Sequence, residues 1–358
     1  MKLFLIGGFL GSGKTTAIQE ACAVLLEEGI KVGVVTNDQG VQLVDTGFLR
    51  SADLPVTEVQ NGCFCCNYSR LEDCIQTLKE SYQPEVVFAE SVGSCTDLVA
   101  TVFKPMLKFH PDIDVLISVF GDARVLPVLL KGSRLFAVSV NYIYKKQLEE
   151  ADVIVVNKVD LITEAQLKEI RHLMKTRFPD KIILYQNSLI PQDVDAWIAV
   201  QINFRRLTGK KSLDIDYDIY GAGEAALAWL DEEIEIHCEE GNSGDAAARL
   251  INAIYSRTSR KELPIGHLKF LVSDGRRREK ISFTTINGKD FVYKPTEFKT
   301  NSVTILINAR VQTAPKSLNE IVSDALSEVR SQDNCRITSK NKEFFQPGYP
   351  EPAYRIAD

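Results

Sequence analysis

Three cysteines occupy four consecutive positions of the chain, within the stretch N-G-C-F-C-C that begins at Asn61. Because Gly62 starts this loop, the sulfurs of Cys63, Cys65 and Cys66 can converge on one point. Thiolates favour Zn²⁺, Cu(I) or iron–sulfur centres over hard cations, and three thiolates leave one coordination position open. A strained, easily reduced disulfide and simple packing are the alternatives. The pattern favours a transition-metal site that exchanges its ion.

A second pattern lies near the start of the chain, where G-F-L-G-S-G-K-T at residues 8–15 fits G-x-x-x-x-G-K-[ST]. It follows an apolar run and precedes a helical run, which is the context that a phosphate-binding loop requires. Inward NH groups and the positive helix end bind phosphate oxygens, the lysine reaches the β- and γ-phosphates, and the threonine hydroxyl binds Mg²⁺. We expect the phosphates to contact Gly8, Gly11, Ser12, Gly13, Lys14, Thr15 and Thr16.

A third pattern, N-K-V-D, follows the apolar run V-I-V-V directly and indicates which base is bound. A carboxylate at Asp160 can accept hydrogen bonds from the two donors on guanine, whereas adenine offers an acceptor there. This favours GTP and GDP over ATP, with Asn157 and Lys158 in the same motif. Ser188, after the run I-I-L-Y, is placed where a loop closes over the base.

Two polar segments at expected strand ends, residues 36–46 and 89–97, supply carboxylates. Ligands gather at the carboxyl ends of parallel strands, so Asp38, Asp45 and Glu90 are candidates for binding Mg²⁺ or orienting the attacking water. Gly93 can donate an NH group to the γ-phosphate. We expect Lys14, Asp38 and Glu90 to be catalytic, and Thr15, Asp38 and Glu90 to hold Mg²⁺. Surface carboxylates without a role are the alternative, and no residue stands out as the water-positioning group.

The elements that position these residues follow from short apolar runs that alternate with amphipathic segments up to about residue 187. This pattern predicts an α/β domain with a mostly parallel sheet of the P-loop NTPase type. We expect that domain at residues 1–204, a polar linker at 205–222, and a smaller α+β domain at 223–358 with helices near 244–258 and 316–330.

Composition limits the location and the partners. The 358 residues carry a formal net charge of −6, and no apolar run approaches the length that spans a bilayer, so neither nucleic acid nor a membrane is an expected partner. Eight cysteines without a secretory signal predict reduced thiols in the cytoplasm. Cys95 is a candidate fourth ligand, although a buried small residue is the favoured interpretation there, and Cys22 and Cys74 fall in helical runs.

Taken together, the motifs resemble those of the CobW-type metallochaperone GTPases, relatives of HypB and UreG. The resemblance rests on G-G-F-L-G-S-G-K-T-T, N-G-C-F-C-C, E-S-V-G, F-G-D-A and Q-L-E-E-A-D-V-I-V-V-N-K-V-D-L, and covers about the first 190 residues. The chain departs from the family where N-D-Q-G-V keeps Asp38 but has Val41 in place of a carboxylate. It also lacks a histidine-rich stretch, and its C-terminal part matches only loosely.

The resemblance implies GTP hydrolysis coupled to a transition metal, with Zn²⁺ expected first and Co²⁺ or Ni²⁺ as alternatives. The client is expected to be a metalloenzyme or a cobalamin-pathway protein, and a homodimer is compatible with the sequence. One alternative is a nucleotide-gated chaperone that reactivates a corrinoid enzyme or metalloenzyme without carrying metal. Another is a small-molecule kinase, which the guanine-type motif disfavours.

Overall fold

The computed structural model describes residues 1–37, 40, 44–50, 54–60, 62–132, 135–204, 209–239, 241–287, 291–294, 298–333 and 335–358. The chain divides into two compact units. Unit 1 comprises Met1–Gln39, Ala52–Gly223 and Tyr349–Asp358. Unit 2 comprises Gly40–Ser51 and Glu224–Gly348, so a short segment from near residue 45 belongs with the C-terminal part of the chain.

Unit 1 is built on a seven-stranded sheet in the order β3-β2-β4-β1-β5-β6-β7, in which each neighbouring pair is parallel. Its strands are β1 (Lys2–Gly8), β2 (Val32–Asn37), β3 (Val56–Val59), β4 (Val86–Glu90), β5 (Asp114–Asp122), β6 (Val153–Asn157) and β7 (Ile182–Gln186). Most of these strands are buried along their length, which explains their continuous apolar runs. The predicted α/β domain with a parallel sheet is confirmed.

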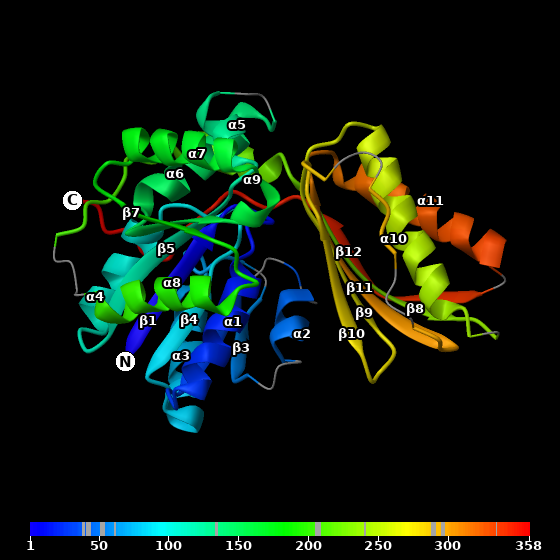
Figure 1. Ribbon diagram of the computed structural model, residues 1–358, viewed down its shortest axis with the longest axis horizontal. Coiled ribbons are helices and arrows are strands. Elements are labelled where there is room, and N and C mark those ends of the chain that lie inside the picture. Colours follow the sequence, from blue (N-terminus) through cyan, green and yellow to red (C-terminus); the bar gives the residue numbers. More distant parts are fainter. Residues whose placement is uncertain are drawn as a thin grey trace. The chain divides into compact units, whose positions relative to one another are not determined.

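Helices join these strands and pack around the sheet (Figure 1). They are α1 (Lys14–Glu27), α3 (Tyr68–Tyr82), α4 (Lys104–Phe109), α5 (Leu126–Leu130), α6 (Val138–Glu150), α7 (Glu164–Arg177), α8 (Pro191–Asn203) and α9 (Tyr217–Ala225), with short turns η1 (Val99–Phe103) and η2 (Val159–Leu161). Helix α9 forms inside the segment that was expected to be a linker, whose residues 205–208 lie outside the described chain.

Unit 2 is an antiparallel five-stranded sheet in the order β10-β9-β11-β8-β12. Its elements are α2 (Val44–Arg50), β8 (Ala228–His237), α10 (Ser243–Arg260), β9 (Ile265–Ser273), β10 (Arg278–Phe283), β11 (Ser302–Val311), α11 (Pro315–Asp333) and β12 (Arg336–Phe345). The predicted second, α+β part is therefore confirmed as a separate antiparallel sheet with helices.

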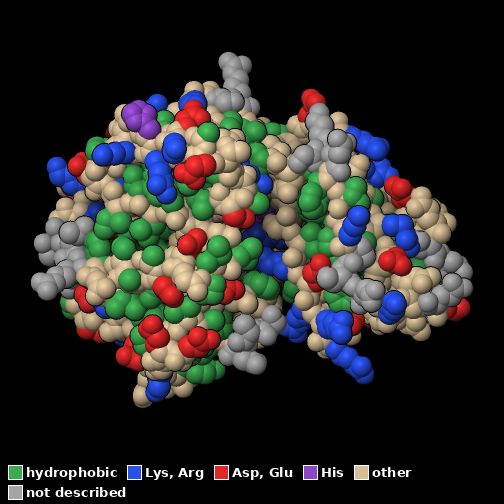
Figure 2. Space-filling model, in the orientation of Figure 1, with side chains coloured by type: hydrophobic (Ala, Val, Ile, Leu, Met, Phe, Trp, Pro, Cys, Tyr) green, Lys and Arg blue, Asp and Glu red, His purple; other side chains and the backbone are tan. Residues whose placement is uncertain are grey.

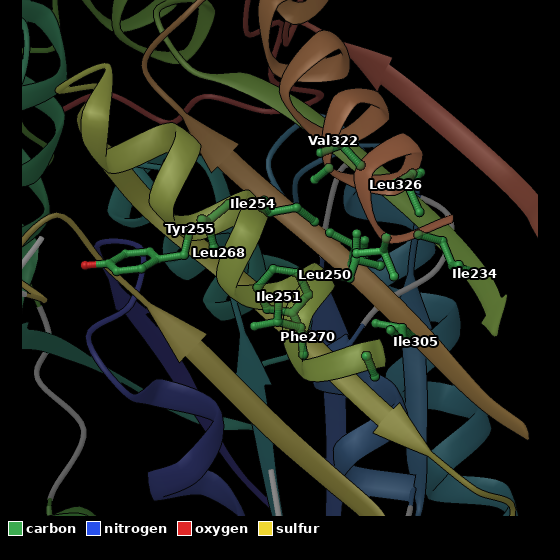
Figure 3. Close-up of a cluster of buried hydrophobic side chains, with 14 of the residues drawn as sticks. Ile234, Leu250, Ile251, Ile254, Tyr255, Leu268, Phe270, Ile305, Val322 and Leu326 are labelled. Carbon is green, nitrogen blue, oxygen red and sulfur yellow. The ribbon is translucent and has the colours of Figure 1, made fainter. Parts of the chain in front are cut away.

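The core of unit 2 lies between this sheet and helices α10 and α11 (Figure 3). Leu250 and Ile254 of α10 and Val322 of α11 lie in the same buried cluster as Phe270 of β9 and Ile305 of β11. Successive side chains of a strand point to opposite faces of the sheet. The face of β9 and β11 that does not carry this cluster therefore presents other side chains. Helix α2 contacts β9, β10 and β11, which places this early segment on the second sheet.

The sequence predicted reduced thiols for the eight cysteines. This prediction is wrong for Cys238 and Cys335, which form a disulfide in unit 2. The register of the sheet explains the pairing. His237 at the end of β8 pairs with Arg336 at the start of β12, so the residues that follow and precede them face each other. The six remaining cysteines are not disulfide-bonded.

The surface carries both signs of charge on the visible face of each unit (Figure 2). That face therefore presents no single-sign field of the kind that attracts a polyanion. Within the described residues, every helix is too short or too polar to cross a bilayer.

Candidate functional site

The loop after β1 has the backbone that its glycines predict. Gly8, Gly11 and Gly13 have φ values of 124°, 73° and 92°, in the region that favours glycine. A Cβ on Gly8 would lie 2.2 Å from the carbonyl oxygen of Phe120, and one on Gly13 would lie 2.4 Å from Asn157 Nδ2. The loop therefore requires glycine at both positions, and it delivers the chain into the N-terminus of α1.

The first residues of α1 bring a cation, a hydroxyl and a carboxylate together. Lys14 Nζ donates to Gly8 O at 2.8 Å and lies 4.0 Å from Glu90 Oε1, while Thr15 Oγ1 donates to the same carboxylate oxygen at 3.0 Å. All three side chains are buried. A buried hydroxyl beside a carboxylate is an oxygen donor set that suits Mg²⁺.

Ser12 gives a further reason to expect an anion in this loop. Its Oγ is buried and has no hydrogen-bond partner among the described residues. Because a buried hydroxyl without a partner costs free energy, a phosphate oxygen at this position would satisfy it. The residues present therefore fit a nucleotide phosphate group.

Asn157, at the end of β6, connects the phosphate loop to the loop after β7. Its Nδ2 donates to Ser12 O at 2.9 Å, and its Oδ1 accepts from Ser188 N at 3.1 Å and Ser188 Oγ at 2.8 Å. Gln186 Nε2 donates to Ser188 Oγ at 2.9 Å. The structure thus brings together three loops that are far apart along the chain.

Asp122, at the end of β5, lies in the motif F-G-D-A and orients the lysine of the neighbouring motif. Lys158 Nζ donates to Asp122 Oδ2 at 2.9 Å and to Gly11 O at 2.5 Å. Arg124 Nη2 also donates to Asp122 Oδ2, at 2.7 Å. Burial disfavours the charged form of Asp122, but Arg124 and Lys158 outweigh it and hold the pKa of the carboxyl below its usual value.

The remaining predicted residues are placed as follows. Asp160 is exposed in η2, Thr16 is half-buried in α1, and a Cβ on Gly93 would lie 2.6 Å from Leu10 Cδ2. Asp38 lies outside the described residues. Asp45 belongs to unit 2, where its carboxylate forms ion pairs with Lys269 and Lys280. Its Mg²⁺ role stays a prediction.

The cysteine loop is held by a residue that sequence reasoning missed, Asn37 at the end of β2. Its Nδ2 donates to Val59 O at 3.0 Å and to Gly62 O at 2.7 Å, and its Oδ1 accepts from Phe64 N at 2.9 Å. Gly62 has φ 144°, and a Cβ there would lie 2.2 Å from Asn67 Nδ2. The loop is therefore fixed on the strand that leads into the segment containing Asp38.

The three thiols of this loop converge. The sulfurs of Cys63, Cys65 and Cys66 lie within 4.8 Å of one another, with 3.3 Å between Cys63 and Cys66 and 3.8 Å between Cys65 and Cys66. They stand just before α3, whose N-terminus favours negative charge. Spacing and geometry together provide the three soft ligands that the sequence predicted.

One thiol of the cluster is set apart as the anion. Hydrogen bonds from the thiols of Cys65, Cys66 and Cys95 hold the pKa of Cys63 well below its ordinary value. Hydrogen bonds with Cys63, Cys66 and Cys95 raise the pKa of Cys65, and the bond to Cys63 raises the pKa of Cys66 to about 12. A thiolate at Cys63 beside two thiols would favour a cation, and binding of the cation would release the remaining thiol protons.

The last residues of the chain cover this loop within unit 1. Ala353 N donates to Cys65 O at 2.8 Å, and the Tyr354 ring packs edge-on against Tyr68 with centroids 5.2 Å apart. Cys63 and Cys65 are only 3% and 2% exposed. The C-terminal segment therefore contacts the loop that carries these two buried cysteines.

Comparison with known proteins supports the same interpretation of the motifs. The family model for the nucleotide-binding domain of CobW/HypB/UreG matches residues 2–184. A zinc chaperone CobW from Sinorhizobium sp is 28% identical over 200 residues, covering 48% of this chain and 55% of the relative. The zinc chaperone YeiR from Escherichia coli K12 is 32% identical over 175 residues, covering 44% and 47%. The chain thus spans about half the length of these relatives.

Two of the solved structures that the comparison finds match this chain to the following extent. HypB from Helicobacter pylori in complex with nickel has a TM-score of 0.42 and 19% identity, and the match covers 57% of this chain and 89% of that one. A Zn(II)-bound triple mutant of the YjiA GTPase has a TM-score of 0.35 and 14% identity, covering 92% of this chain and 98% of that one.

Proposed function

The chain belongs to the CobW/HypB/UreG family, and from that premise we propose that it is a GTP-binding and GTP-hydrolysing metallochaperone of the cytoplasm. Its cargo is a transition metal, with Zn²⁺ first and Co²⁺ or Ni²⁺ as alternatives. The client is a metalloenzyme or a cobalamin-pathway protein. The observation that carries the proposal is the convergence of three thiols on a loop tied to the nucleotide-binding sheet by Asn37.

Nucleotide binding in this proposal uses the residues of the phosphate loop and of the two loops that Asn157 connects. The backbone of Gly8–Thr15 and the side chain of Lys14 bind the phosphates, and Asp160 binds the guanine. Thr15 and Glu90 hold Mg²⁺, which supplies charge neutralisation at the phosphates when it is bound. Glu90 also holds the side chains of Lys14 and Thr15 in position, because its carboxylate contacts both.

Coupling between nucleotide and metal follows from the position of Asn37. The residue holds the cysteine loop through three hydrogen bonds and immediately precedes the segment expected to sense the nucleotide. A shift of that segment between the GTP and GDP states would change the spacing of the sulfurs and therefore the metal affinity. By thermodynamic linkage, metal must then change nucleotide affinity by the same factor.

The test measures bound metal and GTP turnover in the purified chain and in Cys65→Ala, with and without Zn²⁺, Co²⁺ and Ni²⁺. We expect metal-responsive GTP turnover in the wild type, and loss of both bound metal and response in the variant. Cys22→Ala, at a buried cysteine of α1 distant from the cluster in sequence, is the control. Equal metal content and equal turnover in all three proteins would refute the metal role, and faster turnover of ATP than of GTP would favour a kinase.

A further inference from the structure

The C-terminal segment Tyr349–Asp358 is held on unit 1 in the manner of a bound peptide. Its residues, all of them described, form no helix or strand and cross the unit as an extended trace, red in Figure 1. Two of its NH groups donate to carbonyl groups of the unit, Ala353 N to Cys65 O at 2.8 Å and Ile356 N to Ala100 O at 2.9 Å. Main-chain hydrogen bonds of this kind hold an extended peptide, while the side chains between them determine which peptide fits.

The first side chain between these two bonds is that of Tyr354. Its ring packs against the rings of Tyr68 in α3 and Phe109 in α4, with centroids 5.2 Å apart in both pairs. Tyr68 and Phe109 also pack against each other, with centroids 6.3 Å apart. Tyr68 is buried, whereas Phe109 is 42% exposed although it is a large apolar residue. The two rings therefore form a site for one aromatic side chain beside the cysteine loop.

The second side chain is that of Arg355. Its Nε donates to Asp97 Oδ2 at 2.8 Å, and its Nη2 donates to Leu213 O at 3.1 Å. The guanidinium also lies over the ring of Tyr217, 5.6 Å from the centroid. The Tyr217 hydroxyl donates to Asp97 Oδ2 at 2.7 Å. A carboxylate, a carbonyl oxygen and an aromatic face are together the groups that recognise a guanidinium.

Arg355 does not satisfy the whole carboxylate of Asp97. The side chain of Asp97 is fully buried, yet both donors use Oδ2, and Oδ1 has no hydrogen-bond partner among the described residues. Burial raises the pKa of Asp97 although Tyr217 and Arg355 act in the opposite direction. Asp97 also has φ 65°, a left-handed conformation that costs free energy outside glycine and is concentrated at functional sites. A guanidinium that bonded both oxygens would satisfy this carboxylate better.

The C-terminal segment is mostly exposed, whereas the residues that it contacts are buried. Ala353, Tyr354 and Arg355 are exposed, but Cys65 and Asp97 are only 2% and 0% exposed. Because the segment contains no helix or strand that would have to unfold, it can leave the unit without disrupting another element. It is therefore the part of unit 1 that a competing peptide would displace.

We propose that the docking surface formed by Cys65, Tyr68, Asp97, Ala100 and Phe109 binds an extended segment of the client protein in which an aromatic residue is followed by an arginine. The inference rests on the proposed function and deepens it, since it names the chemistry that recognises the client. An acidic or aliphatic segment would leave the buried carboxylate of Asp97 without a counter-charge. The client's segment displaces the C-terminal segment, which brings the recipient of the metal to the loop that carries the thiols.

Fluorescence anisotropy on the metal-free full-length chain tests this proposal with a labelled peptide of residues 349–358, Y-P-E-P-A-Y-R-I-A-D. The double variant Tyr354→Ala, Arg355→Ala weakens the chain's own segment and leaves the docking surface intact. We therefore expect this variant to bind the peptide at least about tenfold more tightly than the wild type does. Deletion of residues 349–358 provides a second variant for the same comparison.

Variants of the peptide test the chemistry of recognition. Tyr354→Ala or Arg355→Ala in the peptide should lower its affinity for the double variant at least about tenfold, whereas Ala357→Ser, at an exposed position, should not change it. An unrelated peptide of glycine and serine that contains the run A-Y-R-I should compete with the labelled peptide. The same peptide with A-E-E-I should not compete.

The outcomes separate this inference from the proposed function. If the labelled peptide binds neither protein, or binds the wild type and the variants equally, the C-terminal segment does not occupy a peptide-docking surface and the inference is overturned. Undiminished affinity of the Arg355→Ala peptide would overturn recognition of arginine by Asp97. Because the assay contains neither metal nor nucleotide, these results leave the metallochaperone intact, and a chain without metal or GTP turnover would still be tested for peptide binding.

Discussion

In the proposed function, the choice of nucleotide depends on Asp160. It is exposed at the start of the loop after β6, where its carboxylate is available to accept from the N1 and N2 donors of guanine. Asp160→Asn should lower kcat/KM for GTP by about tenfold to a hundredfold, since hydrogen bonds to a charged group contribute about 1.5–3 kcal/mol. It should raise kcat/KM for xanthosine triphosphate, because xanthine has a carbonyl where guanine has the N2 amine.

Steady-state turnover of both nucleotides checks this prediction. Asp195→Asn is the control, because it removes the same charge at an exposed position of α8. An unchanged preference for GTP in Asp160→Asn would show that another residue selects the base.

Glu150 makes stability depend on pH. Burial, together with the nearby charge of Asp97, raises its pKa to about 8 from 4.5, although Leu98 N and Lys210 act in the opposite direction. Because the folded state then holds a proton that the unfolded state releases, the free energy of unfolding should fall as pH rises from about 4.5 to about 8. The loss is on the order of 5 kcal/mol at about 1.4 kcal/mol per unit of pKa.

Glu150→Gln should remove this pH dependence and be more stable than the wild type above pH 8, because the amide is neutral throughout and can still accept from Leu98 N. Urea unfolding at a series of pH values measures the effect. Glu149→Gln on the same helix, whose carboxylate pairs with Lys145 and Lys146, should keep the wild-type slope. If the free energy of unfolding of Glu150→Gln fell with pH as steeply as that of the wild type, Glu150 would not be the source of the pH dependence.

Individual residues show where sequence reasoning reached its limit. The motifs predicted that the cysteines cluster, that Glu90 adjoins the phosphate loop and that Asn157 adjoins Ser188, and the structure brings these residues together. Asn37 was missed as the residue that holds the cysteine loop, because it acts through contacts between strands that are neighbours only in the folded sheet. Its role as a coupling residue stays a prediction.

Among the elements, the C-terminal segment Tyr349–Asp358 contacts the cysteine loop, and we predict that it limits access to the thiols. Besides its contacts with Cys65 and Tyr68, Arg355 Nε donates to Asp97 at 2.8 Å and Ile356 N donates to Ala100 O at 2.9 Å. Deleting residues 349–358 should increase the rate at which Cys65 reacts with a maleimide by at least about tenfold in the metal-free chain, which corresponds to about 1.4 kcal/mol of lost protection.

Mass spectrometry of the labelled peptides separates Cys65 from the more exposed Cys66. Tyr349→Phe is the matched control, since it removes a hydrogen bond to Asp218 and leaves the contacts with the cysteine loop. Equal labelling of Cys65 in the deletion variant and the wild type would show that the segment does not limit access.

Strands also differ in how well the sequence predicted them. Strands β1, β2, β4, β5 and β6 of unit 1 were evident because they are buried almost along their length and their apolar runs are continuous. Strand β12 was not, since most of its residues are exposed and its sequence R-I-T-S-K-N-K-E-F-F lacks the alternation of a half-buried strand. The disulfide was missed for the same reason, because only the register of β12 on β8 places Cys335 opposite Cys238.

At the scale of the whole molecule, the chain passes from unit 1 to unit 2 shortly after strand β2. The segment Gly40–Ser51 is anchored on the second sheet, where Val44 N donates to Asn308 Oδ1 at 2.7 Å and Asp45 pairs with Lys269 and Lys280. Helix α2 therefore belongs to unit 2 by its contacts, although in the sequence it follows strand β2 of unit 1. We predict that a rearrangement at the end of β2 acts on the second sheet through this anchor.

Asp45→Asn should weaken the effect that a rearrangement at the end of β2 has on the second sheet. Burial opposes ionisation of Asp45, but Lys269 and Lys280 keep its pKa well below the ordinary value, so the wild type carries a charged anchor at neutral pH. The amide leaves two lysines without their shared carboxylate, at a cost of about 1–3 kcal/mol. In the wild type, we expect amide hydrogen exchange in β9 and β10 to differ between the GTP-analogue and GDP forms, and in Asp45→Asn this difference should shrink or vanish.

Glu343→Gln provides the comparison, because it removes one negative charge from an exposed position of β12 in the same sheet. That variant should retain the nucleotide-dependent difference in β9 and β10. Since all three proteins keep the phosphate loop, they should bind GTP analogue equally, and a loss of binding in Asp45→Asn would mean that the residue acts on the nucleotide itself. If instead binding is equal and the exchange difference persists, the second sheet receives the nucleotide signal by a route other than α2.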